Sequence, residues 1–221
     1  MEREYYQLVS PEQSIKMVTK ELIIETATNL FVHNGVKTVT IDKIVKELHT
    51  SKRTIYSHFD DKIDLLRPCL NEYNKKVKKE NEDIIQSSAN AIEAMGYLHQ
   101  KIISRAYNVN PNFFSDILHY YPGLLHESYK NTGNFAHHQL VYLAKWGIKD
   151  GIFQKDMDVE VVGKTVLSLV KLLKDNKQFP ASKYSIERLT FGILVPYLRG
   201  VCTNKGVELL KIQEELFRVS I

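Results

Sequence analysis

Cysteine, glycine and proline are all scarce in this sequence of 221 residues. The two cysteines, Cys69 and Cys202, lie far apart, which argues against a disulfide scaffold and favours reduced thiols and a cytoplasmic location. Ten Gly and six Pro are too few for a collagen-like or low-complexity chain. No stretch approaches the ~18 consecutive apolar residues that a membrane span needs. We therefore expect a globular protein that does not cross a membrane.

Signatures of the common enzyme classes are missing as well. The sequence has no GxSxG, HExxH or P-loop motif and no recognisable pair of catalytic carboxylates. His137 and His138 are adjacent, and adjacent residues of a helix point about 100° apart, so the pair is a poor chelate. We expect no enzymatic activity, no cofactor and no metal site. The net charge of +4 is too small to indicate a nucleic-acid partner by itself.

Strand signals are nearly absent, and helical spacing of apolar residues dominates from end to end. The first helix is expected to begin at a Ser10 cap and to end at Gly35. Later breaks are expected at Asn110-Pro111, Tyr121-Pro122-Gly123 and Gly151. The pattern predicts an all-α fold.

The most informative segment runs from Thr40 to Lys62. Thr40 is expected to open a short helix with one apolar face, and Ser51 to cap a second short helix that is mostly polar. Two short helices joined by a tight turn are typical of a helix-turn-helix. The second helix leaves hydrogen-bond donors and cations free, which suit the acceptors and phosphates of a DNA groove. Between residues 36 and 58, five cations stand against two acids, a local charge of +3.

This segment resembles the tetracycline-repressor-like (TetR) family of bacterial transcription regulators, closely so over residues 16–66. The matching residues are Gly35 to Thr40, Ile44, Ser51-Lys52, Thr54-Ile55-Tyr56, His58-Phe59 and Lys62. The resemblance implies an N-terminal three-helix DNA-binding domain over residues 1–61, of which residues 1–9 form an arm. A larger helical domain for effector binding and dimerisation would follow over residues 62–221.

The resemblance also implies a regulator, most commonly a repressor, that binds a near-palindromic operator in double-stranded DNA as a homodimer and senses a small molecule. The DNA backbone would be contacted by Thr40, Ser51, Lys52, Tyr56 and Lys62. The groove would be faced by Arg53, Thr54, Ser57 and His58, and the core would hold Ile44, Ile55 and Phe59. His49 departs from the family, which often has Gly at this turn position, where a positive φ is favoured. The alternative is a helical protein-interaction adaptor that keeps the helix-turn-helix shape without specific DNA binding.

Aromatic residues gather in residues 97–153, which hold 11 of the 22 in the chain. They either line a cavity for an unknown small-molecule effector or fill the core, and the sequence leaves both alternatives open. The candidates for an effector cavity are Phe113, Phe114, Tyr120, Tyr121, Tyr142 and Trp146.

Two late helices, expected over residues 159–176 and 185–202, are too apolar to have two exposed faces. Gly163 and Gly192 would let backbones approach closely, so two such helices from each subunit could form a four-helix interface. The candidate interface residues are Val162, Val166, Leu169, Leu173, Leu189, Ile193 and Tyr197. The alternative is that these helices are buried within one subunit. A last short helix is expected over residues 206–218 after an Asn204 cap.

Overall fold

The computed structural model describes residues 18–218, without the side chains of residues 129–134. The expected cap at Ser10 and the arm over residues 1–9 therefore lie outside the described residues. Within the described range the chain is helical and contains no strand, only an isolated bridge between Phe153 and Cys202. The helices are α1 (Lys20–Asn34), α2 (Ile41–Glu47), α3 (Lys52–Tyr56), α4 (Lys62–Ser87), α5 (Ala91–Asn108), α6 (Asn112–Tyr120), α7 (Pro122–Lys149), α8 (Val159–Leu172), α9 (Ile186–Leu189), the π-helix η1 (Thr190–Leu194), α10 (Val195–Val201), α11 (Asn204–Ile212) and the 3-10 helix η2 (Glu214–Phe217).

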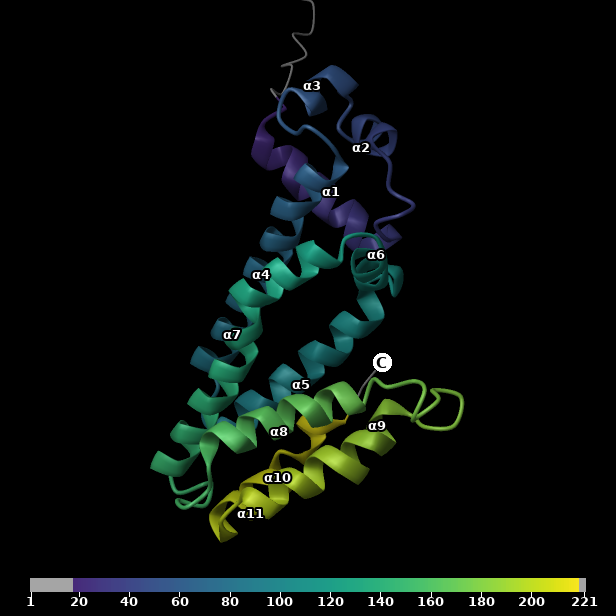
Figure 1. Ribbon diagram of the computed structural model, residues 1–221. Helices are drawn as coiled ribbons and strands as arrows, with labels where there is room; N and C mark the ends of the chain where they lie inside the picture. The colour runs from purple at the N-terminus through teal and green to yellow at the C-terminus, as the bar shows by residue number, and fades with distance from the viewer. Residues whose placement is uncertain (1–17, 219–221) are drawn as a thin grey trace, which may run out of the picture.

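The molecule has two hydrophobic cores, one at each end (Figure 1). The first core unites α1, α2 and α3 with the start of α4 and with α6, so that Phe113 and Ile117 pack among N-terminal residues. The second core is built from α5, the end of α7 and the segments from α8 to η2. The long helices α4, α5 and α7 run between the two ends (Figure 1). Continuous helices therefore connect the two cores.

Side-chain caps set most of the helix starts near the N-terminus. Thr40 and Ser51 accept a backbone N–H in the first turn of α2 and α3, as the sequence predicted, and Asp61 does the same for α4. The helix α1 begins at Lys20, and Thr19 is its cap.

The C-terminal segments differ from the prediction in three places. Helix α8 ends at Leu172, four residues earlier than expected. The helix expected over residues 185–202 is divided by η1, where the N–H of Val195 donates to the carbonyl of Thr190, five residues back. Because Pro196 has no N–H to donate, this wider turn accommodates it without breaking the segment. The last helix is capped by Thr203 and not by Asn204, because the Thr203 hydroxyl oxygen accepts the N–H of Gly206.

Candidate nucleic-acid interface

Helices α2 and α3 form a helix-turn-helix whose inner side packs against the N-terminal core. Ile44, Ile55 and Phe59 all pack in the N-terminal core, as predicted. In the turn, His49 adopts a φ of 48°, which is the left-handed conformation expected where the related sequences often have Gly. The turn is held by the N–H of Thr50, which donates to the carbonyl of Val45. Helix α3 is short, but its inward side chains fix its orientation.

The outer side of α3 faces solvent and carries the polar side chains that the sequence singled out. Tyr56 is 51% exposed although it is a large aromatic residue. Its exposure leaves both the ring and the hydroxyl available to a partner. The other exposed candidates are Thr40, Ser51, Lys52, Arg53 and Ser57, whereas Thr54 and His58 are half-buried.

The hydroxyls of Ser51 and Ser57 already form hydrogen bonds at the two ends of α3. Ser51 Oγ accepts the N–H of Thr54 at 3.1 Å and lies 3.0 Å from Thr54 Oγ1. Ser57 Oγ donates to the carbonyl of Thr54 at 2.8 Å. A hydroxyl oxygen has two lone pairs and one proton, so Ser51 can cap α3 and still contact another group.

Lys52 is paired across the turn with an acid of α2. Its ammonium lies 2.7 Å from Asp42 Oδ1, and both side chains are more than half exposed. The hydrogen bond to Asp42 raises the pKa of Lys52 above its ordinary value. Lys52 is therefore charged, and a phosphate could replace Asp42 as its partner.

Lys62 is turned toward the protein and not toward solvent. Its ammonium donates to the carbonyl of Val36 at 2.6 Å and lies 5.8 Å from the centre of the Phe31 ring. Desolvation in this position lowers the pKa of Lys62. Its proposed contact with a phosphate therefore needs a change of rotamer and stays a prediction.

Lys20 is a cation of this end that the sequence analysis did not single out. Its ammonium lies 5.1 Å from the centre of the Phe59 ring, so the start of α1 adds positive charge beside the end of α3. Nothing in the local pattern around Lys20 signals this contact, because it depends on how α1 crosses the helix-turn-helix.

Residues 23–69 match the family described as bacterial regulatory proteins, tetR family. This segment is a tetR-family helix-turn-helix domain. Three solved structures extend the similarity in fold to most of the chain, each at 20% sequence identity or less. A TetR-family regulator from Streptomyces coelicolor has a TM-score of 0.61 and 20% identity, and the match covers 81% of this chain and 93% of that one. A TetR-family regulator from Cytophaga hutchinsonii has a TM-score of 0.67 and 16% identity, and the match covers 84% of this chain and 95% of that one. A transcriptional regulator from Saccharomonospora viridis in complex with choline has a TM-score of 0.58 and 19% identity, and the match covers 82% of this chain and 96% of that one. No curated protein matches the chain.

The tetR-family domain is fastened to the rest of the chain through the start of α6. The N–H of Asn110 donates to the carbonyl of Val32 at 2.8 Å, and its side-chain amide donates to the carbonyl of His33 at 3.2 Å. Asp116 Oδ2 accepts the N–H of Lys37 at 2.7 Å. These contacts join α6 and the turn before it to the end of α1 and to the loop before α2.

The six aromatic candidates for an effector cavity are not brought together. Phe113 is buried in the N-terminal core, where it packs against Tyr73 and Phe114. Tyr120 lies beneath the ammonium of Lys37, and Tyr142 is 56% exposed. Tyr121 joins the N-terminal core and Trp146 packs against the C-terminal core. The sequence did not indicate this, because adjacent residues of a helix point in different directions, so that Phe113 is buried in the N-terminal core while Phe114 is exposed.

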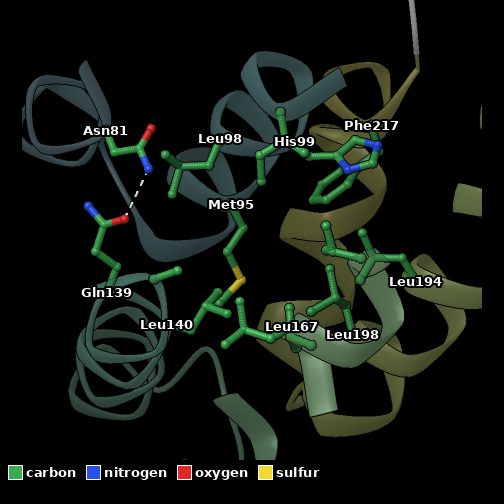
Figure 2. Close-up of a pocket in the computed structure, with 14 residues that line it drawn as sticks. Asn81, Met95, Leu98, His99, Gln139, Leu140, Leu167, Leu194, Leu198 and Phe217 are labelled. Atoms are coloured by element: carbon green, nitrogen blue, oxygen red, sulfur yellow. Dashed lines mark hydrogen bonds between the residues drawn. The ribbon is translucent and has the colours of Figure 1, made fainter. Parts of the chain in front are cut away.

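An apolar cavity of about 90 Å³ does lie in the C-terminal domain, and none of those six residues lines it. It is lined from α4, α5, α7, α8, η1 and α10, together with Phe217, and most of these residues are aliphatic (Figure 2). A second, more open hollow of about 340 Å³ includes Phe114 beside Arg105 and Lys174.

The interface candidates divide into two groups. Val166, Leu173 and Leu189 are buried within this chain's own core, so a partner cannot reach them. The half-exposed candidates are Val162, Leu169, Ile193 and Tyr197. Gly163 also faces inward, because a Cβ there would lie 3.2 Å from the ring of His137, whereas a Cβ on Gly192 would meet open space.

Two general findings concern the residues with described positions. No helix there is both long enough and apolar enough to span a membrane. No group of His, Cys, Asp and Glu there could hold a metal ion, and His137 pairs with Glu160 at 2.6 Å.

Proposed function

We propose that this chain is a cytoplasmic transcriptional repressor that binds a near-palindromic operator as a homodimer and responds to a small-molecule effector. The observation that carries the proposal is the outer side of α3, where Lys52, Arg53 and Tyr56 are exposed on a helix anchored through Ile55. A surface for another protein usually has an apolar centre, whereas this one is polar and cationic. Such a surface suits the acceptors and phosphates of duplex DNA.

The side chains of the interface divide into two roles. Thr40, Ser51, Lys52 and Tyr56 would bind phosphates, which fixes the position of the domain but carries no sequence information. Arg53 would read base edges in the major groove, where a guanidinium fits the two acceptors of guanine. Binding by several cations releases counterions, so the affinity should fall steeply as salt is added.

An effector would act by changing the separation of the two α3 helices in the dimer. The anchors from Asn110 and Asp116 to the tetR-family domain supply a path, since a shift of α5 or α6 carries the end of α1 with it. One separation would match successive half-sites of the operator, about 34 Å apart, and the other would not. The effector can bias this choice only by binding one state more tightly than the other.

The test begins with selection of bound duplexes from a random DNA pool, followed by titration of the selected operator. A Lys52→Ala, Tyr56→Phe double variant should bind all sequences about tenfold or more weakly and with a smaller salt dependence. Arg53→Ala should instead change the preferred base at one position of each half-site. Lys149→Ala, which removes an exposed cation at the far end of α7, is the matched control and should bind as the parent does.

Two outcomes would contradict the proposal. Equal affinity of the double variant and the parent would show that α3 does not contact DNA. Failure of the selection to enrich any sequence, with binding insensitive to salt, would favour the adaptor function instead.

A further inference from the structure

Two residues that line the apolar cavity each carry a buried polar atom that has no hydrogen-bond partner. Four buried side-chain nitrogen or oxygen atoms among the described residues lack a hydrogen bond, and two of them, His99 Nδ1 and Gln139 Nε2, belong to residues that line this cavity. A buried polar atom without a partner is costly, and native proteins retain few of them. The pairing of two such atoms with a cavity indicates that a ligand supplies the missing bonds.

The proton on His99 can be placed from its neighbours. His99 Nε2 lies 3.1 Å from Thr190 Oγ1, and the Thr190 hydroxyl donates its only proton to the carbonyl of Ile186 at 2.9 Å. Thr190 must therefore accept from His99, so Nε2 carries the hydrogen and Nδ1 presents a lone pair. Burial, with the charge of Lys174 adding to it, lowers the pKa of His99 to about 4, so the ring is neutral near pH 7. His99 Nδ1 is thus an acceptor that needs a donor.

The amide of Gln139 is oriented by a chain of hydrogen bonds. Arg105, which is paired with Glu80, donates to Asn81 Oδ1 at 2.9 Å. Asn81 Nδ2 then donates to Gln139 Oε1 at 3.0 Å (Figure 2). A guanidinium cannot accept a hydrogen bond, so it fixes both amides, and Gln139 Nε2 remains as a donor without an acceptor.

The two residues lie on either side of an apolar space. Figure 2 shows Gln139 and His99 on opposite sides of the cavity, with Met95, Leu98 and Leu140 among the side chains between them. The volume of about 90 Å³ is smaller than the roughly 150 Å³ that accommodates benzene in a protein core. A slender aliphatic chain fits this shape better than a ring system does, and the flexible side chain of Met95 can yield to it.

We propose that this cavity binds a short, uncharged aliphatic ligand whose hydroxyl donates to His99 Nδ1 and whose carbonyl accepts from Gln139 Nε2. The inference rests on the proposed function, for which this ligand is the effector. A carboxylate or an ammonium is excluded because no group of opposite charge lines the cavity, and burying an unpaired charge is very costly. The π-helix contributes directly, because Thr190 at its start holds His99 and Leu194 at its end lines the cavity.

The experiment uses four probes of one chain length: butan-1-ol, butan-2-one, butanoate and butylammonium. Each is titrated into the full-length protein, and binding is followed by amide chemical shifts of the cavity residues. Butan-1-ol and butan-2-one should bind at the cavity and the two charged probes should not. Tighter binding of either charged probe than of butan-1-ol would overturn the proposal, as would the failure of both neutral probes to bind.

Three variants test the two polar anchors separately. His99→Phe should weaken the binding of butan-1-ol by about tenfold and leave the binding of butan-2-one nearly unchanged, and Gln139→Leu should do the reverse. Thr190→Val keeps the side-chain shape but frees the proton on His99 to move to Nδ1, so the discrimination between alcohol and ketone at His99 should be lost. His119→Phe, an exposed histidine on α6, is the control. Unchanged affinities for both probes in all three cavity variants would disprove the assignment.

Operator binding is measured in parallel to separate this inference from the proposed function. The cavity variants should bind operator DNA as the parent does in the absence of probe. If the parent binds operator DNA but none of the probes, the cavity assignment alone is rejected. Probe binding in a chain that selects no DNA would support the cavity assignment and reject the regulator.

Discussion

At the scale of single residues, the pair between Asp42 and Lys52 shows how a cation that we propose to bind DNA can be held before DNA arrives. Asp42 lies in the first turn of α2, where a negative charge is favourable, and Lys52 is the first residue of α3, where a positive charge is not. The ion pair offsets this cost for Lys52 while no phosphate is present. Because both side chains are exposed, the pair contributes little to the stability of the fold.

Removing the acid should therefore strengthen DNA binding with little effect on stability. In Asp42→Asn, Lys52 no longer has to leave a carboxylate, and one negative charge near the phosphates is lost, so we expect affinity to rise by roughly three- to tenfold at low salt. Titration by fluorescence anisotropy at two salt concentrations checks this. Asp83→Asn, an exposed acid on α4, is the control, and equal gains in both variants would show only a general effect of net charge.

His99 predicts a dependence of stability on pH. Its pKa is about 4 in the folded chain against an ordinary 6.5, so the unfolded chain takes up a proton that the folded chain refuses. The contribution of His99 to the free energy of unfolding is therefore fully present above pH 6.5 and is lost as the pH falls toward 4, by on the order of 3 kcal/mol. Urea unfolding at several pH values checks this. His99→Phe lacks the group and should lose clearly less stability than the parent between pH 6.5 and 4.

At the scale of elements, α11 approaches the loop between α7 and α8 so closely that only glycine fits near its start. A Cβ on Gly206 would lie 2.1 Å from the carbonyl oxygen of Ile152, which already accepts the N–H of Thr203 at 2.9 Å. The backbone of this loop is also paired with the end of α10 through Phe153 and Cys202. Neither backbone can move without breaking these bonds.

Gly206→Ala should accordingly destabilise the chain by about 1–3 kcal/mol, the usual cost of overpacking a core. Gly123→Ala is the matched control, because a Cβ there meets nothing within 4 Å. Alanine in that exposed first turn of α7 should leave stability unchanged or raise it by up to about 1 kcal/mol. Thermal and urea unfolding of both variants give the comparison, and similar values for the two would contradict the close approach.

At the scale of the whole molecule, the proposed homodimer has to be formed by residues that the chain leaves partly exposed. Leu169 on α8 and Ile193 in η1 remain half-exposed beside a core that they only partly cover, and the surface at Gly192 is open. Burial of these apolar side chains against their copies would supply the driving force for association. Two α3 helices on one rigid dimer could then meet two successive major grooves.

Leu169→Glu and Ile193→Glu should each weaken dimerisation by at least roughly a hundredfold, since each would bury a charge without a partner. Sedimentation velocity over a range of concentrations measures the effect, and circular dichroism confirms that the chain still folds. Ile212→Glu replaces an exposed apolar residue on α11 and should remain dimeric. Weaker operator binding should accompany the loss of the dimer, and a parent that sediments as a monomer would contradict this expectation directly.

Local chemistry made much of the DNA-binding end predictable from sequence. The caps at Thr40, Ser51 and Asp61 depend on a side chain and an N–H two or three residues away, so their spacing is visible in the sequence. The inward position of Ile55 and the exposure of Tyr56 follow from helical periodicity in the same way. Even the strained φ of His49 could be expected from the turn that contains it.

The tertiary structure alone decided what depends on distant segments. His99 meets Thr190 across 91 positions of sequence, and the Lys62 ammonium is directed at a carbonyl 26 residues earlier. The crossing of the helices also places Phe113 in the N-terminal core, and it buries Val166 and Leu189 in the interior of their own chain. Periodicity identifies the apolar side of a helix, but which neighbour covers that side is decided by the packing of the whole chain, because hydrophobic burial is not directional.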